Sequence, residues 1–377
     1  MTSSVLTEVL SGNGSNKIAI ATLNKPDTLN GLSLQMCHEL TKALAQWEQD
    51  PDIKVIILRG AGDRAFCAGG DLHGLYSSML ENTGKGAWDN AYTREFFDVE
   101  YRLDYQIHTY SKPIMCWGNG IVMGGGVGLM MGASHRVVTD TTRFAMPEIT
   151  IGLFPDVGGT WMLSRLPNGI GNFLALTGSQ LGASDCIMLD LADFSVHSEH
   201  FQSIVNELLK IEWSEERTTR DLQLQNVLQS DQFTINPDPG PLKQHYDLIR
   251  KKCSSRDFMT VCENIKSFAE INDPWMQRAA KTFTAGAPGS ARLSYELLKR
   301  VKHLSLADVF RLEYIVSLNC GVQGDFQEGI RALLIDKDRT PKWNPSTLEE
   351  ATQQWVQLYF KEPWPAETEH PLADLAN

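Results

Sequence analysis

The first half of the chain alternates short hydrophobic runs with amphipathic stretches. The runs Ile18–Leu23 and Val55–Leu58 are apolar, and the second has the branched residues of a strand that is covered on both faces. Between them, Ser33 precedes apolar positions spaced three and four apart, which predicts a capped helix that stops at Asp50–Pro51. The same alternation predicts a helix over 92–110, a strand over 114–117, a helix near 127–133 and a strand over 136–139. This half therefore has an α/β pattern.

The pattern changes from about Glu199 onward. Strand signals disappear, and helical periodicity dominates the rest of the chain. The expected helices are 200–210, 213–229, 241–252, 274–283, 290–302 and 306–318. We therefore divide the chain into an α/β core over 1–198 and a helical C-terminal region over 199–377.

The charge balance narrows the range of partners. The chain has 34 Lys and Arg against 46 Asp and Glu, which gives a net charge of −12 at pH 7. An acidic surface repels phosphate backbones, and no basic cluster interrupts it in the sequence, so nucleic-acid binding is disfavoured. One phosphorylated small molecule held in a local pocket remains compatible with this charge.

The cysteines and the N-terminal segment bear on the compartment. Seven scattered cysteines without a CxxC pair are typical of a reducing compartment, and they predict neither a disulfide framework nor a zinc knuckle. The first 23 residues contain Glu8, no arginine and no apolar core, unlike a secretory signal or a mitochondrial presequence. We expect a soluble, cytoplasmic protein.

One uncharged stretch, Pro113–Ser134, is long enough to cross a bilayer. However, seven of its residues are glycine and Asn119 lies inside it, which would destabilise a continuous helix. A buried strand, a glycine turn and a buried helix explain this stretch better, so we expect no membrane insertion.

Several common catalytic motifs are absent. The dinucleotide fingerprint GxGxxG fails, because Met123 and Leu129 stand where its last glycine would be needed. Neither the P-loop nor the GxSxG nucleophile elbow occurs. His197 and His200 lie three residues apart, but two surface histidines at a helix start explain them better than a metal site. We expect no metal.

Two glycine-rich loops lie at predicted strand-to-helix turns, namely residues 67–71 (CAGGD) and 124–126 (GGG). Backbone N–H groups at such turns are free, and glycine lets a ligand approach them closely. Two converging N–H donors form an oxyanion hole, which stabilises a carbonyl oxygen as it gains negative charge. The alternative is two tight turns that need glycine for steric reasons alone. Spacing leaves both interpretations open.

A third segment, residues 144–161, places acidic residues among apolar ones. Glu148 is the only charged residue of its apolar run, so its carboxyl group either turns out to solvent beside Pro147 or lies buried with a raised pKa. The buried case is typical of a general base or nucleophile. Asp156 is a second catalytic candidate, or it merely caps a helix that begins near Gly159.

Taken together, these segments strongly resemble the crotonase (enoyl-CoA hydratase/isomerase) superfamily, and more narrowly its 3-hydroxyisobutyryl-CoA hydrolase branch. The resemblance rests on residues 65–76 (AFCAGGDLHGLY), 112–129 (KPIMCWGNGIVMGGGVGL), 144–161 (FAMPEITIGLFPDVGGTW) and 325–343 (DFQEGIRALLIDKDRTPKW). It implies a spiral core of β–β–α turns with a helical C-terminal part, often assembled as a trimer.

The resemblance also implies roles for the glycine loops. Gly70 and Gly125 would supply the oxyanion-hole amides for the carbonyl of a CoA thioester. Ala68 and its neighbours would meet the adenine and pantetheine of CoA through backbone atoms. CoA would enter as part of an acyl-CoA substrate, so no separate cofactor is expected.

The acidic residues gain roles by the same resemblance. Glu148 stands at the position of the family's catalytic glutamate, while Asp156 and Glu100 match carboxylates around the acyl group in the hydrolase branch. Without the resemblance, Glu100 would be a solvated helix residue. Hydratases need a second glutamate where this chain has Gly128, and this difference favours hydrolysis.

The resemblance therefore implies hydrolysis of a short branched β-hydroxyacyl-CoA, with 3-hydroxyisobutyryl-CoA of valine breakdown as the expected substrate. The alternatives are an enoyl-CoA hydratase or isomerase, and a module that only binds acyl-CoA. RNA binding is disfavoured by the charge. Covalent chemistry at Cys67 is disfavoured because no histidine lies closer in sequence than His73.

Overall fold

The computed structural model describes residues 3–376, which form two compact units built from interleaved segments. Unit 1 comprises Met1–Gly70, Leu103–Phe144 and Leu181–Gln244. Unit 2 comprises Asp71–Arg102, Ala145–Gln180 and His245–Asn377. These units differ from the division predicted near residue 198, because residues 199–244 cluster with unit 1.

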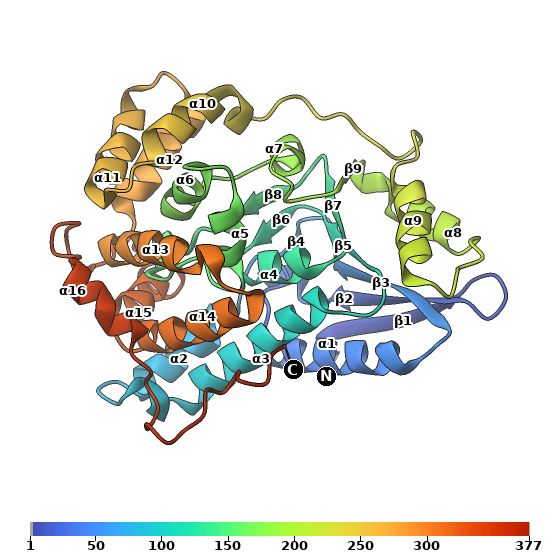
Figure 1. The fold of residues 1–377 in the computed structure, drawn as a ribbon, viewed down its shortest axis with the longest axis horizontal. Coiled ribbons are helices and arrows are strands. Elements are labelled where there is room, and N and C mark those ends of the chain that lie inside the picture. Colours follow the sequence, from blue (N-terminus) through green and yellow to red (C-terminus); the bar gives the residue numbers. More distant parts are fainter. Residues whose placement is uncertain (1–2, 377) are drawn as a thin grey trace. The chain divides into compact units, whose positions relative to one another are not determined.

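Unit 1 contains a six-stranded sheet whose strand order is β1-β2-β3-β5-β7-β9 (Figure 1). The strands are β1 (Val5–Ser11), β2 (Lys17–Leu23), β3 (Ile53–Gly60), β5 (Ile114–Gly118), β7 (His135–Thr139) and β9 (Phe194–Val196). Only β1 runs antiparallel to its neighbour; the other pairs are parallel. The predicted runs correspond to β2, β3, β5 and β7, whereas β1 and β9 were not predicted.

A second, three-stranded sheet has the order β4-β6-β8. Its strands are β4 (Ala65–Cys67), β6 (Ile121–Met123) and β8 (Arg143–Ala145). In chain order, β3 and β4 precede α2 (Leu72–Glu81), β5 and β6 precede α4 (Gly125–Gly132), and β7 and β8 precede α5 (Gly159–Arg165). This β–β–α repeat, with one strand of each pair in each sheet, is the predicted spiral core.

The core of unit 1 explains why its strands read as continuous apolar runs. Val55 and Ile57 are fully buried in a cluster that also takes in residues of α8 (Phe201–Leu208) and α9 (Arg217–Leu228). The alternate residue Ile56 is equally buried, so strand β3 is covered on both of its faces. Helix α1 (Leu34–Gln49) begins as predicted, with Oγ of Ser33 accepting a 3.3 Å hydrogen bond from the Met36 amide.

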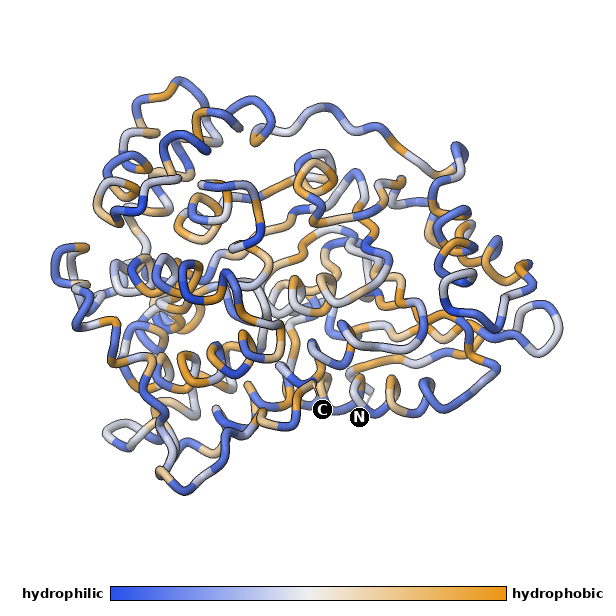
Figure 2. Tube along the Cα trace, in the orientation of Figure 1, coloured by the Kyte–Doolittle hydropathy of each residue, from blue (hydrophilic) through white to orange (hydrophobic). Residues whose placement is uncertain are grey.

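Unit 2 is mainly helical. Besides α2 and α5, it holds η3 (Glu148–Ile151), α6 (Ile170–Thr177), α11 (Phe258–Ser267), α12 (Pro274–Ala285), α13 (Pro288–Arg300), α14 (Leu306–Cys320), α15 (Asp325–Ile330) and α16 (Gln353–Val356). Hydrophobic and hydrophilic positions alternate around α13 and α14 (Figure 2). This alternation explains why these helices could be predicted from periodicity.

Two helices cross from one unit to the other, α3 (Ala91–His108) and α10 (Pro241–Cys253). All six helices predicted after residue 199 occur within a few residues of their expected bounds, whereas α11, α15 and α16 were not predicted. The uncharged stretch 113–134 forms β5 and α4, which are the expected buried strand and helix, and also the short strand β6, which was not predicted. Across residues 3–376, no helix combines the length and apolar character needed to cross a membrane.

Candidate active site

Within unit 1, the structure brings the two glycine loops into contact. Strands β4 and β6 pair in parallel, so their carboxyl ends and the loops that follow lie at the same edge of the sheet. A Cβ atom placed on Gly126 would lie 2.3 Å from the carbonyl oxygen of Cys67. Glycine is thus required at 126 for the backbones of the two loops to touch. The steric interpretation of these glycines is correct for this position.

The same contact leaves two backbone donors without partners. Neither the N–H of Gly70 nor that of Gly125 donates a hydrogen bond to any group of residues 3–376. Gly125 begins α4. The first amides of a helix have no acceptor inside the helix, and they form the positive end of its dipole. The N–H of Ala68, in contrast, already donates to the Leu29 carbonyl at 3.1 Å. Unit 1 therefore offers two free amides, at the two positions that the family resemblance implies for an oxyanion hole.

In unit 2, the carboxyl group of Glu148 is buried. Glu148 is 4% exposed at the start of η3, and its Oε2 atom has no hydrogen-bond partner in the described part of the chain. Burial raises the pKa of Glu148 well above its ordinary value, and the charge of Asp156 raises it further. Of the two orientations considered from the sequence, the buried one is correct.

Asp156 lies in the same buried acidic group. Its Oδ2 atom accepts a 2.9 Å hydrogen bond from the hydroxyl of Tyr101, which lies 2.6 Å from Oγ of Ser317. Burial raises the pKa of Asp156 to about 7, although the Tyr101 hydrogen bond opposes this rise. Helix α5 does begin at Gly159, but no side chain caps it. The side chain of Asp156 therefore serves the acidic group and not the helix cap.

Glu100 is a third member of this group. The residue precedes Tyr101 on α3 and is 3% exposed, so its interpretation as a solvated helix residue is wrong. Burial raises the pKa of its carboxyl group well above the ordinary value, and the charge of Asp156 adds to the rise.

Sequence reasoning missed a fourth acid, Glu313 on α14, which is fully buried. Its carboxylate accepts hydrogen bonds from the amides of Gly158, at 2.8 Å, and Thr160, at 3.2 Å, and from the Thr160 hydroxyl. Between Asp156 and Gly158, Val157 has a φ of 53°, which is costly for a β-branched residue. Glu313 thus holds the strained turn that carries Asp156.

These four carboxyl groups share one electrostatic property. No positive charge lowers the pKa of Glu100, Glu148, Asp156 or Glu313, and burial is the largest cause of the rise in each case. Carboxyl groups buried together without a cation cannot all be ionised near neutral pH. The group therefore holds at least one protonated carboxyl group near neutral pH, and such a group can act as a general acid.

A weak signal in the sequence could have revealed the missed residues. Glu313 and Ser317 lie four apart on α14, so they occupy one helix face among apolar neighbours. Polar residues on an otherwise buried face indicate a hydrogen-bonded interior cluster. Their partners lie more than 150 residues away in the chain, and no local pattern identifies those.

The other candidates give no competing site. Cys67 is fully buried, and its thiol lies 3.7 Å from the carbonyl oxygen of Gly69. The rings of His197 and His200 meet edge to face with centroids 5.7 Å apart. In the described residues, no three His, Cys, Asp or Glu side chains are arranged to hold a metal ion.

This combination of a β–β–α spiral, two free glycine amides and a buried acidic group defines an enzyme of the crotonase type, and comparison with known proteins agrees. The sequence model of the enoyl-CoA hydratase/isomerase family matches residues 18–360. The chain therefore belongs to this family. Among relatives, it is similar to the mitochondrial 3-hydroxyisobutyryl-CoA hydrolase of Xenopus tropicalis, with 36% identity over 90% of this chain and 86% of that protein.

Solved structures show the same fold. A carnitinyl-CoA dehydratase from Mycobacterium thermoresistibile matches with a TM-score of 0.83 and 32% identity, over 98% of this chain and 99% of the other. An enoyl-CoA hydratase from Rhodobacter sphaeroides matches with a TM-score of 0.81 and 31% identity, over 95% and 97%. The predicted crotonase fold is confirmed.

Proposed function

We propose that this protein hydrolyses 3-hydroxyisobutyryl-CoA to 3-hydroxyisobutyrate and CoA. The observation that carries the proposal is the buried Glu148, whose carboxyl group has an unpartnered oxygen atom and a raised pKa beside Asp156. A pure binding module has no need of such a group, because burying an acid without a cation costs stability. The name of the Xenopus relative supports the choice of substrate.

In the proposed reaction, two backbone amides are the hydrogen-bond donors. The amides of Gly70 and Gly125 donate to the thioester carbonyl oxygen, and they bind it more strongly as it becomes an oxyanion. Backbone amides suit this task because they carry no net charge and need no reorganisation during the reaction. Ala68 has its N–H satisfied by Leu29, so its proposed contact with CoA uses the carbonyl group.

Glu148 is the proposed nucleophile or base. In one route the Glu148 carboxylate attacks the thioester carbon, the C–S bond breaks to release CoA thiolate, and water hydrolyses the resulting anhydride. In the other route Glu148 takes a proton from the water that attacks directly. In both routes Glu148 must be ionised when the reaction begins, while a neighbouring acid can protonate the departing thiolate.

Asp156 and Glu100 are proposed to recognise the β-hydroxyl group of the substrate. Both carboxyl groups are buried, and an acyl group that lacks the hydroxyl would leave one of them unpaired. Such a loss disfavours the wrong substrate much more than a missing methyl group would.

Hydration is the second candidate, because two solved structures of this fold bear the names of a hydratase and a dehydratase. The sequence argues against it at one position. Gly128 lies inside α4, where no carboxyl group is available to serve as the second acid of a hydratase. A single catalytic glutamate is better suited to acyl transfer to water.

Three further expectations accompany the proposal. CoA is needed only as part of the substrate, and a homotrimer is the expected assembly, which light scattering would measure. The seven cysteines are all buried, and none of them forms a disulfide bond within residues 3–376, which supports a reducing compartment. The cytoplasm stays our prediction for that compartment, and the Xenopus relative is named as mitochondrial. Cell fractionation would distinguish the two.

The test is release of free thiol from 3-hydroxyisobutyryl-CoA, with crotonyl-CoA and 3-hydroxypropionyl-CoA assayed alongside. Glu148→Gln keeps the shape of the side chain but removes its basicity, and we expect a loss of at least about 100-fold in kcat. Glu349→Gln is the matched control, because Glu349 is exposed. Unchanged hydrolysis in Glu148→Gln, or hydration of crotonyl-CoA without thiol release, would contradict the proposal.

A further inference from the structure

A cavity in unit 2 is lined by none of the buried acids. It has a volume of about 880 Å³ and is formed by the end of α5, the start of α6, residues 254–256 and the end of α13. A cavity of this size accommodates an ordinary small molecule. None of Glu100, Glu148, Asp156 or Glu313 contributes to its lining.

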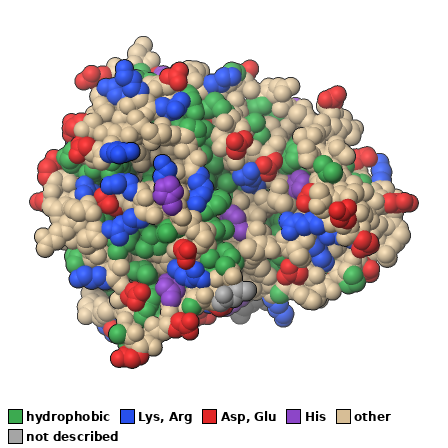
Figure 3. Space-filling model, in the orientation of Figure 1, with side chains coloured by type: hydrophobic (Ala, Val, Ile, Leu, Met, Phe, Trp, Pro, Cys, Tyr) green, Lys and Arg blue, Asp and Glu red, His purple; other side chains and the backbone are tan. Residues whose placement is uncertain are grey.

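The lining is basic. Arg165, Arg256, Lys299, Lys302 and His303 all line the cavity, and no Asp or Glu is among the described residues around it. Lys, Arg and His side chains gather on this face over α5 and α13 (Figure 3). A lining without acids is unexpected in a chain whose net charge is −12. No run of the sequence reveals this basic cluster, because three distant segments of the chain assemble it.

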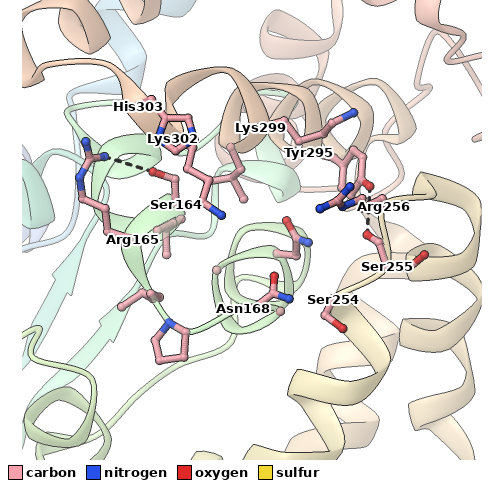
Figure 4. A pocket seen from close by; sticks show the side chains of 17 residues that line it. Ser164, Arg165, Asn168, Ser254, Ser255, Arg256, Tyr295, Lys299, Lys302 and His303 are labelled. Atoms are coloured by element: carbon pink, nitrogen blue, oxygen red, sulfur yellow. Dashed lines mark hydrogen bonds between the residues drawn. The ribbon is translucent and has the colours of Figure 1, made fainter.

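The cations differ in how far they are neutralised. Lys299 is paired with Glu296 at 3.7 Å. Arg165 donates to the carbonyl groups of Trp161 and Leu304, so it is held in place while its charge is not cancelled by an acid. Arg256 and Lys302 form no ion pair with any acid in residues 3–376. Figure 4 shows their nitrogen ends pointing into the hollow from opposite sides.

Neutral donors complete the lining. Asn168 and Ser254 lie below the two basic side chains in Figure 4. Helix α6 begins here, its cap residue Gly169 provides no side-chain hydrogen bond, and the amides of Gly171 and Asn172 donate to nothing in the described part of the chain. Free amides at a helix start, next to Arg and Lys, are the donors that bind phosphate oxygens.

We propose that this cavity binds a small ligand that carries phosphate groups, held chiefly by Arg256 and Lys302. The net charge of the chain, −12, and the limited volume of the cavity favour a small phosphate ester or polyphosphate over nucleic acid. Two sources provide this chemistry, namely the phosphate-bearing end of a CoA ester and a free nucleotide or polyphosphate. The proposal does not rest on thioester hydrolysis.

The test is calorimetric titration of the full-length protein with inorganic pyrophosphate and with adenosine 3′,5′-bisphosphate at low ionic strength. In the variant Arg256→Gln/Lys302→Gln we expect the affinity for both probes to fall by about tenfold or more, because charge-assisted hydrogen bonds are lost. The control is Arg278→Gln/Lys281→Gln, which removes one exposed Arg and one exposed Lys from α12 and changes the net charge equally. Both variants alter exposed side chains only, so both should fold.

The source of the ligand is decided by competition. If CoA displaces pyrophosphate and Arg256→Gln/Lys302→Gln raises the KM for the thioester with kcat unchanged, the ligand is the phosphate-bearing end of CoA. If pyrophosphate still binds when CoA is saturating, the ligand is a free phosphate compound. Both results support the cavity as a phosphate site. Absence of pyrophosphate binding, or an equal loss in the control variant, would overturn it.

Discussion

The hydroxyl group of Tyr101 connects Asp156 to Ser317. It donates a 2.9 Å hydrogen bond to the Asp156 carboxylate and lies 2.6 Å from Oγ of Ser317. When Asp156 is ionised, the Tyr101 proton points to it, so Ser317 must be the donor to the tyrosine oxygen. Tyr101 is fully buried, and burial raises its pKa, which keeps it a neutral donor at all ordinary pH values. This chain of hydrogen bonds is what stabilises the charged form of Asp156.

Removing the Tyr101 hydroxyl should therefore change the charge state of Asp156. In Tyr101→Phe the hydrogen bond that lowers the pKa of Asp156 is lost, so we expect the acidic limb of the rate profile to move to higher pH by about one unit. Activity should recover at alkaline pH, because the geometry of the acids is otherwise kept. Ser317→Ala removes only the outer link and should move the limb less. A Tyr101→Phe profile that matches the wild type would exclude this role.

Glu313 is predicted to act as a positioning residue for Asp156. Glu313→Ala leaves the amides of Gly158 and Thr160 without an acceptor, and the turn with the strained Val157 loses its support. We expect kcat to fall by about 10- to 100-fold with little change in KM, since misplacing a catalytic group by a fraction of an ångström has effects of this size. Glu313→Gln retains an acceptor and should restore most of the activity. If both variants lost stability and activity in parallel, the role would be structural only.

Much of the fold could be predicted because it rests on local patterns. The apolar run Val55–Leu58 is buried on both faces of its sheet, and the spacing of apolar residues after Ser33 corresponds to the buried face of α1. The short strands β4, β6 and β8 were missed, since three residues are too few to show a period. The two interleaved units were also missed, because clustering depends on contacts between distant segments.

The residues of the candidate site also fall into those that local patterns predict and those that depend on distant contacts. Glycine loops and an acid in an apolar run are local signals, and they indicated the loops 67–71 and 124–126 and the residue Glu148 from the sequence. The choice of Gly70 and Gly125 within these loops came from the family resemblance. The environment of Glu100 was misjudged without the family resemblance, because one helix residue does not reveal what covers it. Glu313 was missed because its partners, Gly158 and Thr160, lie on a turn more than 150 residues away.

Gly126 provides a test of the contact between the two loops. In Gly126→Ala the new methyl group would lie 2.3 Å from the carbonyl oxygen of Cys67, so the loops must separate. We expect a loss of about 1–3 kcal/mol in the free energy of unfolding, together with reduced thioester hydrolysis. Gly182→Ala is the control, because nothing lies within 4 Å of its added methyl group and its φ is −90°. Denaturant unfolding measures the first effect, and equal stability of the two variants would disprove the close contact.

The buried acids should make the protein less stable as the pH rises. The pKa of Glu313 is raised from 4.5 to about 8, and that of Asp156 from 3.8 to about 7, so the folded state holds these protons more tightly than the unfolded chain does. The contribution of these two acids to the free energy of unfolding is complete below pH 4, and it is lost as the pH rises through 7 to 8. For Glu313 alone the loss amounts to up to about 5 kcal/mol.

Glu313→Gln isolates this contribution because the amide does not titrate. Thermal unfolding at intervals between pH 5 and pH 9 should show a falling Tm in the wild-type protein and a shallower fall in the variant. The stability difference between the two proteins should shift in favour of the variant as the pH rises. Parallel curves over this range would mean that Glu313 is ionised throughout, and that the hydrogen bonds from Gly158 and Thr160 outweigh its burial.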